Sequence, residues 1–512
     1  MKVECKRGFR SELKAVEGKR VTMNASTIDT VVINGQVVTP AGIRREAIAI
    51  HEGKIVGVMD EKLLPQARTK IDAKGKHILP GIVDPEAHPG HSDPLTLDVQ
   101  TETRAAAVAG VTTWGVHNPS PRFGSEPFKK FVEPEDVVSF KKVFPGGREI
   151  WNANSMVDVF FCFQMESDEQ AEEIPYYIEE YGVTSFKFYC HVRRLDADNF
   201  WGAQRTGLAL GFDDGTFYLA CQKAAEAGGM VMIHPENWEV ARVLEKQLIA
   251  SGRTDMGAWD DRSPWFTEAH HIRSFGYLAK MTGCPIYIQH STNPLSFEEI
   301  RKSRAEGIRM IAQTGSPWLF FTRDDWRINV PLRNREAIEA TWEALRDGTI
   351  DAVGSDHVVA RGTREKMEAE GVWSKEKSGF PSRVEAHLPA MLHAGINEKR
   401  ITWERLVEVC CENPARIFGL YPKKGAILPG SDADLVVIDI DREVEVRDDM
   451  IHSRPGWSLM SGRKIKGWPV MTMLRGRVIA EWPDDAPRPQ IVGEPFGRYL
   501  PRKGRSDNCK LY

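Results

Sequence analysis

The pattern of apolar and polar positions changes several times along the 512 residues. Residues 1–27 are mixed and charged without a clear period, and we expect an N-terminal extension there. Residues 28–80 form short β-rich segments separated by turn residues, and Asn34-Gly35 is typical of a type I′ hairpin. This pattern predicts short antiparallel strands, as in a small β-sandwich.

Residues 81–420 follow another pattern, in which short apolar runs end in small or polar residues and amphipathic stretches follow them. "GVTSFKFYC" and "GGMVMIHPEN" are such runs, and "NREAIEATWEALRDG" is a helix-like stretch. The β-rich style returns at 421–485, and a basic tail, 486–512, is either a loose arm or an inter-subunit strap. The expected fold is α/β: a TIM-like (β/α)₈ barrel over 81–420 with a small β-sandwich domain formed by both chain ends.

Composition narrows the class of protein. Apolar residues make up 41% and charged residues 27%, and the net charge of −4 gives no reason to expect a nucleic-acid partner. An apolar run of about 18 residues, as a membrane span needs, does not occur, and the polar start does not resemble a secretory signal. The eight cysteines include no C-x-x-C pair and are expected to be reduced. We therefore expect a cytoplasmic protein without a membrane partner.

Several expected barrel strands end in a residue that can bind a metal. These residues are His88, Lys187, His234, His290 and Asp356. The C-terminal ends of barrel strands meet at one mouth, and nitrogen and oxygen ligands suit Zn, Mn, Fe or Co. A bound metal lowers the pKa of its water from about 15.7 to about 7, and a nearby carboxylate can pass the proton to a leaving amine. Taken singly, each residue is also explained as a structural histidine or a helix cap; together they favour a metal site.

The motifs resemble those of the amidohydrolase superfamily, specifically its hydantoinase/dihydropyrimidinase group of cyclic amidases, over roughly residues 28–485. The segments that carry the resemblance are "PGIVDPEAH", "GVTSFKFY", "IHPEN", "QHST" and "INVPLRNREAIEATWEALRDGTIDAVGSDH". The resemblance implies a carboxylated Lys187 that bridges two divalent cations, with zinc expected first and Mn, Fe or Co as alternatives. It also implies that His88 and Asp356 bind the first ion, that His234 and His290 bind the second, and that Asp356 shuttles the proton.

Two positions depart from the group's pattern. Glu86 stands where the group has the first histidine of its strand-one pair, and it either ligates metal through oxygen or points away and leaves a single ion. The tyrosine that the group places five residues after the lysine is Val192 here. His191, beside it, either takes over as a donor to the developing oxyanion or is structural.

The resemblance places the substrate near Ser291, Gln313–Gly315 and Asn329, whose backbone groups would hold a ring amide. The aromatic side chain of Trp318 either lines an apolar pocket there or belongs to the core. The expected function is metal-dependent hydrolysis of a C–N bond in a cyclic amide, imide or ureide, a small-molecule substrate. One alternative keeps the site and changes the substrate to an acyclic amide, aryl urea or carbamate. Another is a non-catalytic scaffold homologue. The resemblance also implies a homo-oligomer, because members of the group usually form tetramers or dimers.

Overall fold

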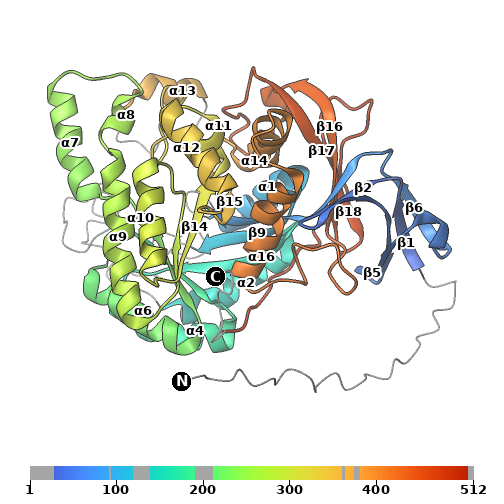
Figure 1. The fold of residues 1–512 in the computed structure, drawn as a ribbon, viewed down its shortest axis with the longest axis horizontal. Coiled ribbons are helices and arrows are strands. Elements are labelled where there is room, and N and C mark those ends of the chain that lie inside the picture. Colours follow the sequence, from blue (N-terminus) through green and yellow to red (C-terminus); the bar gives the residue numbers. More distant parts are fainter. Residues whose placement is uncertain are drawn as a thin grey trace, which may run out of the picture.

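The computed structural model describes residues 28–90, 94–118, 139–190, 212–359, 364–373 and 381–504 (Figure 1). Eight parallel strands form one sheet in the order β8 to β15. Ala87, at the end of β8, forms a parallel bridge with His357, just after β15, so the two edge strands meet and the sheet closes into the expected barrel. The strands are β8 (Ile82–Ala87), β9 (Val111–Asn118), β10 (Asp158–Gln164), β11 (Ser185–Tyr189), β12 (Met230–His234), β13 (Ile286–Ile288), β14 (Met310–Gly315) and β15 (Ala352–Gly354).

Helices between the strands cover the barrel, and their sequences show why they form. In α12 (Arg335–Arg346), Asn334 caps the N-terminus by accepting a hydrogen bond from the backbone N–H of Ala337 at 3.0 Å, and the buried side chains recur every three or four residues. This confirms the helix expected in that segment. The longer helices of the outer layer are α1 (Leu95–Val108), α2 (Phe140–Asn154), α4 (Ile174–Tyr181), α6 (Asp214–Ala227), α7 (Trp238–Ala250), α9 (Trp265–Thr282) and α10 (Pro294–Ala305). The shorter ones are α3 (Asp168–Glu172), α8 (Ala258–Asp261), α11 (Ser316–Phe320), α13 (Arg364–Glu370), α14 (Val384–Ala390), α15 (Trp403–Val407) and α16 (Asn413–Ile417). Within the described ranges, none of the helices is long and apolar enough to cross a membrane.

Both ends of the chain contribute to the second domain, where the first strands lie beside the last ones (Figure 1). One sheet has the order β5-β4-β1-β6, and the other has the order β19-β18-β17-β16-β7-β2-β3. The N-terminal strands are β1 (Ile28–Ile33), β2 (Gln36–Thr39), β3 (Gly42–Arg45), β4 (Ala47–His51), β5 (Lys54–Met59), β6 (Ala67–Asp72) and β7 (His77–Pro80). The C-terminal strands are β16 (Leu435–Glu445), β17 (Lys464–Leu474), β18 (Arg477–Glu481) and β19 (Gln490–Ile491).

The hairpin expected at Asn34-Gly35 is wrong. β1 pairs with β4 and β6, whereas β2 pairs with β3 and β7, so the chain crosses from one sheet to the other at this turn. A Cβ on Gly35 would lie 2.8 Å from Cγ1 of Ile78, so the crossing needs glycine there for space. The local turn signal was real, but it does not say which strands pair.

The described part of the tail packs against its own barrel. Tyr499 forms a parallel bridge with Val159 in β10. Arg502 is 4% exposed, and its guanidinium donates to the Ser185 hydroxyl at 3.0 Å and to the Phe161 carbonyl. The described part of the tail is therefore bound to the barrel of its own chain.

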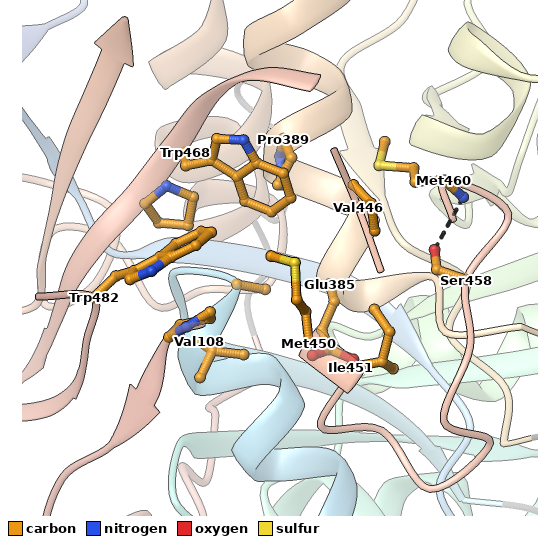
Figure 2. A pocket seen from close by; sticks show the side chains of 13 residues that line it. Val108, Glu385, Pro389, Val446, Met450, Ile451, Ser458, Met460, Trp468 and Trp482 are labelled. Carbon is orange, nitrogen blue, oxygen red and sulfur yellow. Dashed lines mark hydrogen bonds between the residues drawn. The ribbon is translucent and has the colours of Figure 1, made fainter. Parts of the chain in front are cut away.

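A small apolar cavity lies between the barrel and the sandwich, with Trp468, Trp482 and Met450 gathered around it (Figure 2). The two indole rings meet edge to face, with their centroids 5.4 Å apart. The cavity volume is about 30 Å³, which is room for water and not for a substrate. Glu385 of α14 borders it and accepts a hydrogen bond from the backbone N–H of His452 at 2.8 Å. The C-terminal segment thus braces α14, which begins directly after a site residue described below.

A buried ion cluster joins the start of barrel strand β10 to the sandwich. Asp158, Asp432 and Asp434 have oxygens close enough together to hold a cation. The Lys424 ammonium already lies among them, with Nζ–O distances of 2.6, 2.9 and 2.7 Å. The three carboxylates raise the pKa of Lys424 against the opposing effect of burial. The cluster is therefore an ion-pair network that fixes the two domains together.

Replacing Lys424 with methionine is expected to destabilise the fold by about 3–5 kcal/mol, because buried carboxylates lose their central counter-charge. Thermal unfolding checks this. Lys302→Met is the matched control: its ion pair with Glu298, at 2.6 Å, is half exposed, and the unfolding midpoint should stay unchanged. Equal midpoints for both variants would contradict the role of the cluster.

Candidate metal centre

The structure brings the six residues expected at a metal site to one end of the barrel. Glu86 lies in β8 and His88 follows it, Lys187 lies in β11, and His234 ends β12. His290 and Asp356 follow β13 and β15. All six side chains are buried, with exposed fractions of 5% or less. Parallel pairing of the strands places these sequence-distant groups side by side.

Glu86 points into the cluster and connects its two halves. Its Oε1 lies 3.8 Å from His88 Nε2, 3.4 Å from Lys187 Nζ and 3.8 Å from His290 Nε2. Ligand atoms of Glu86, His88 and Asp356 all lie within 4.8 Å of one another. Of the two alternatives left by the sequence, the structure shows a carboxylate directed at the other candidate ligands.

The remaining contacts complete two adjacent groups. His88 Nε2 lies 3.1 Å from Asp356 Oδ1, and the Tyr189 hydroxyl lies 3.1 Å from the other ring nitrogen of His88. The rings of His234 and His290 meet edge to face, with centroids 4.4 Å apart. This gives one group around His88 and Asp356 and a second around the two histidines, with Glu86 and Lys187 between them.

Two of the candidate ligands sit on strained backbone. His290 has φ +32° and Asp356 has φ +49°, in the left-handed region that residues other than glycine rarely adopt. Each lies two residues after the end of a short barrel strand. Strain of this kind is held where the surrounding structure requires a particular side-chain direction, and it concentrates at functional sites.

The charges of the cluster suit metal ligation. Burial raises the pKa of Asp356, but the Arg383 guanidinium and the hydrogen bond with His88 outweigh it and lower the pKa to about 2. Burial holds the pKa of His290 well below its usual value, so this imidazole is neutral. Burial also lowers the pKa of Lys187, although Glu86 and Asp356 oppose it. An anionic carboxylate and a neutral imidazole are the forms that bind metals, and a neutral amine is the form that reacts with CO₂.

The chemistry of the donor set tests whether these residues fit a metal. His290 presents its Nε2 to Glu86 Oε1 at 3.8 Å, and ligand atoms of Glu86, His88 and Asp356 lie within 4.8 Å of one another. Imidazole nitrogens and carboxylate oxygens are donors that fit a divalent cation of the Zn, Mn, Fe or Co type.

Two of the residues expected at the substrate, Ser291 and Trp318, lie beside His290, and all four have defined positions. Ser291 follows His290 and its backbone N–H donates to the Gln313 carbonyl at 2.7 Å, while Gly315 ends β14. The Trp318 ring lies 5.4 Å from that of His290, and its indole N–H points to the Val330 and Pro331 carbonyls. Asn329 Oδ1 accepts a hydrogen bond from Arg262 at 2.8 Å. His191, expected as an oxyanion donor, lies outside the described residues.

Sequence reasoning missed Arg383 and Gln289, and it placed Gln313 only near the substrate, without its contact with Glu86. Arg383 donates from Nη1 to the Asp356 carbonyl at 2.7 Å and also to its carboxylate. The amide groups of Gln289 and Gln313 both donate to Glu86. The one available signal was that Gln289 directly precedes a candidate ligand in "QHST". Nothing in the sequence around Arg383 pairs it with Asp356.

The barrel and the donors converging at its C-terminal rim define a barrel enzyme that uses a divalent metal. Residues 300–479 match the sequence profile described as the Amidohydrolase family. An L-hydantoinase of Paenarthrobacter aurescens is 30% identical over 93% of this chain and 98% of its own length. A D-hydantoinase of Ralstonia pickettii is 29% identical over 93% and 99%. A solved D-hydantoinase structure, 28% identical, superposes with a TM-score of 0.80 over 93% of this chain and 99% of the other. The chain belongs to the amidohydrolase family, in its hydantoinase group.

Proposed function

We propose that the protein hydrolyses the C–N bond of a cyclic amide, imide or ureide at this centre, as a hydantoinase does. The observation that carries the proposal is the convergence of six buried candidate ligands at one rim, where the Glu86 carboxylate faces His88, Lys187 and His290. Membership of the hydantoinase group over nearly the whole chain supports the substrate class. The contacts of the six residues argue against a scaffold that has lost its ligands, because each expected position still carries a donor.

We assign the cofactor as two divalent cations, zinc in the first instance, with Lys187 carboxylated between them. His88 and Asp356 would hold one ion, and His234 and His290 the other. The cations supply Lewis acidity and lower the pKa of the attacking water. Glu86 adds an oxygen donor that faces both groups.

The chain's own residues orient the substrate and move the proton. Asp356, anionic and 3.1 Å from His88 Nε2, takes the proton of the attacking water and delivers it to the ring nitrogen. Backbone groups at Ser291, Gly315 and Asn329 would hold the ring amide, with Trp318 as an apolar wall. His191 is assigned as the donor to the developing oxyanion.

A substrate panel tests this function. The full chain, supplied with divalent metal and bicarbonate, is assayed with a hydantoin, a dihydrouracil, a cyclic imide, an aryl urea and a linear amide, and metal is counted per chain. We expect ring opening of at least one cyclic compound, about two ions per chain, and loss of turnover after chelation. Cleavage of only the urea or linear amide would replace the substrate class, and a metal-free, inactive protein would refute the proposal.

We also propose a homo-oligomer in the cytoplasm. Phe266, Tyr277 and Met281 lie along one side of α9 and are each about half exposed, which leaves an apolar strip for a second subunit. Light scattering of the purified protein would refute this if it finds a monomer.

The six cysteines in the described ranges are buried thiols, which supports a reducing compartment such as the cytoplasm. Cell fractionation tests this location.

A further inference from the structure

Glu86 is held on both of its oxygens by side-chain amides. Gln289 Nε2 donates to Oε1 at 2.6 Å, and Gln313 Nε2 donates to Oε2. All three side chains are fully buried, so these hydrogen bonds do not compete with bulk water. Gln289 directly follows β13 and Gln313 lies in β14, and neither strand adjoins β8 in the barrel.

A third residue fixes the direction of one amide. The Tyr287 hydroxyl donates to Gln313 Oε1 at 2.6 Å, so the NH₂ end of that amide must face Glu86. An NH₂ group can only donate, and it therefore needs an acceptor at position 86. A carboxylate satisfies this requirement, whereas the N–H of a neutral imidazole does not.

We propose that Gln289 and Gln313 are positioning residues that hold Glu86 as an anionic oxygen ligand of the metal centre. The proposal rests on the proposed function, since it assumes that the centre binds a divalent cation. Neutral amides orient the carboxylate without adding a positive charge beside the cation, which Lys or Arg would do. Each carboxylate oxygen has two lone pairs, so an oxygen that accepts one amide hydrogen bond can still coordinate.

This arrangement has a consequence for the choice of metal. Carboxylates suit Mn²⁺ better than imidazole does, while imidazole suits Zn²⁺. A centre with Glu86 should therefore tolerate Mn²⁺ better than the same centre with histidine at this position. The ratio of the affinities for the two cations reports the ligand at position 86 without any activity measurement.

The first test removes the donors. Gln313→Met and Gln289→Met keep side-chain length but cannot donate, and chelator competition measures the affinity of the full chain for Mn²⁺ and Zn²⁺. We expect each variant to lose about 10–100-fold in affinity, as is usual when the partner that orients a ligand is removed. Asn413→Leu is the control, because its amide donates to the Asp351 carbonyl at the other end of β15, at 2.9 Å, and its affinity should match wild type.

The second test changes positions 86 and 313 together so that the donor and the acceptor trade places. A purely structural role for Gln313 cannot explain the result expected from it. Glu86→His alone places an imidazole N–H opposite the Gln313 donor and should bind metal weakly. Adding Gln313→Glu supplies an acceptor for that N–H, and we expect at least about tenfold recovery of affinity together with a shift from Mn²⁺ towards Zn²⁺.

The outcomes separate the two proposals. A wild-type protein that binds metal, with glutamine variants that bind it equally well, overturns the role of Gln289 and Gln313 and leaves the proposed function standing. An exchange variant that binds no better than Glu86→His also overturns it. A wild-type protein that binds neither cation overturns both proposals.

Discussion

Replacing Asp356 with asparagine is expected to lower kcat for ring opening of the cyclic substrate by about 10²–10⁴-fold, the range that a positioned acid–base group contributes. The amide has nearly the same shape but neither accepts the proton nor carries the negative charge. That charge is firmly held, because Arg383 and His88 lower the pKa of Asp356 to about 2. Steady-state kinetics with metal counted in the same sample give the comparison.

A matched control lies at the other end of the same strand. Asp351 precedes β15, and its carboxylate accepts a hydrogen bond from the backbone N–H of Ala312 at 2.8 Å, far from the C-terminal rim. Asp351→Asn should cost stability and leave kcat of the folded protein unchanged. If the two variants lose turnover equally, Asp356 has no special role in moving the proton.

The sequence predicted the class of fold and which candidate ligands lie together, for a physical reason. Side chains at the carboxyl ends of parallel strands meet at one rim, so His234 and His290 could be placed together from their position after apolar runs alone. The Asn34-Gly35 turn shows the limit of this reasoning. A turn signal is local, whereas the choice between pairing β1 with β2 and sending them to different sheets depends on residues far along the chain.

The hydrogen-bond partners of the candidate ligands could not be predicted from the sequence, for the same reason. Arg383, just before α14, contacts Asp356, and the direction of the Glu86 side chain depends on the amides of Gln289 and Gln313. These contacts are set by barrel register and side-chain direction, which no spacing in the sequence encodes. The departure of Glu86 from the family pattern therefore became interpretable only with Gln289 and Gln313 in view.

Lys187→Met is expected to abolish turnover and to lower metal affinity by more than about 100-fold, beyond the loss from removing an orienting partner. In the wild type, Nζ lies 3.4 Å from Glu86 Oε1 and burial lowers the pKa of the amine, which favours the neutral form that adds CO₂. A carbamate there would stand beside Glu86 and Asp356, and three buried anions are tolerable only with cations between them.

Carboxylation and metal binding should therefore depend on each other. Because coupling between two binding events is reciprocal, bicarbonate should raise the metal affinity of the wild-type apoprotein, and metal should raise the uptake of labelled bicarbonate by the same factor. Lys187→Met removes the amine and should abolish both responses, whereas Lys424→Arg, which keeps the cation of the distant ion cluster, should show both. Wild-type affinity that is indifferent to bicarbonate would mean that Lys187 stays an ammonium paired with Glu86, and the centre would then hold its cations without a bridging carbamate.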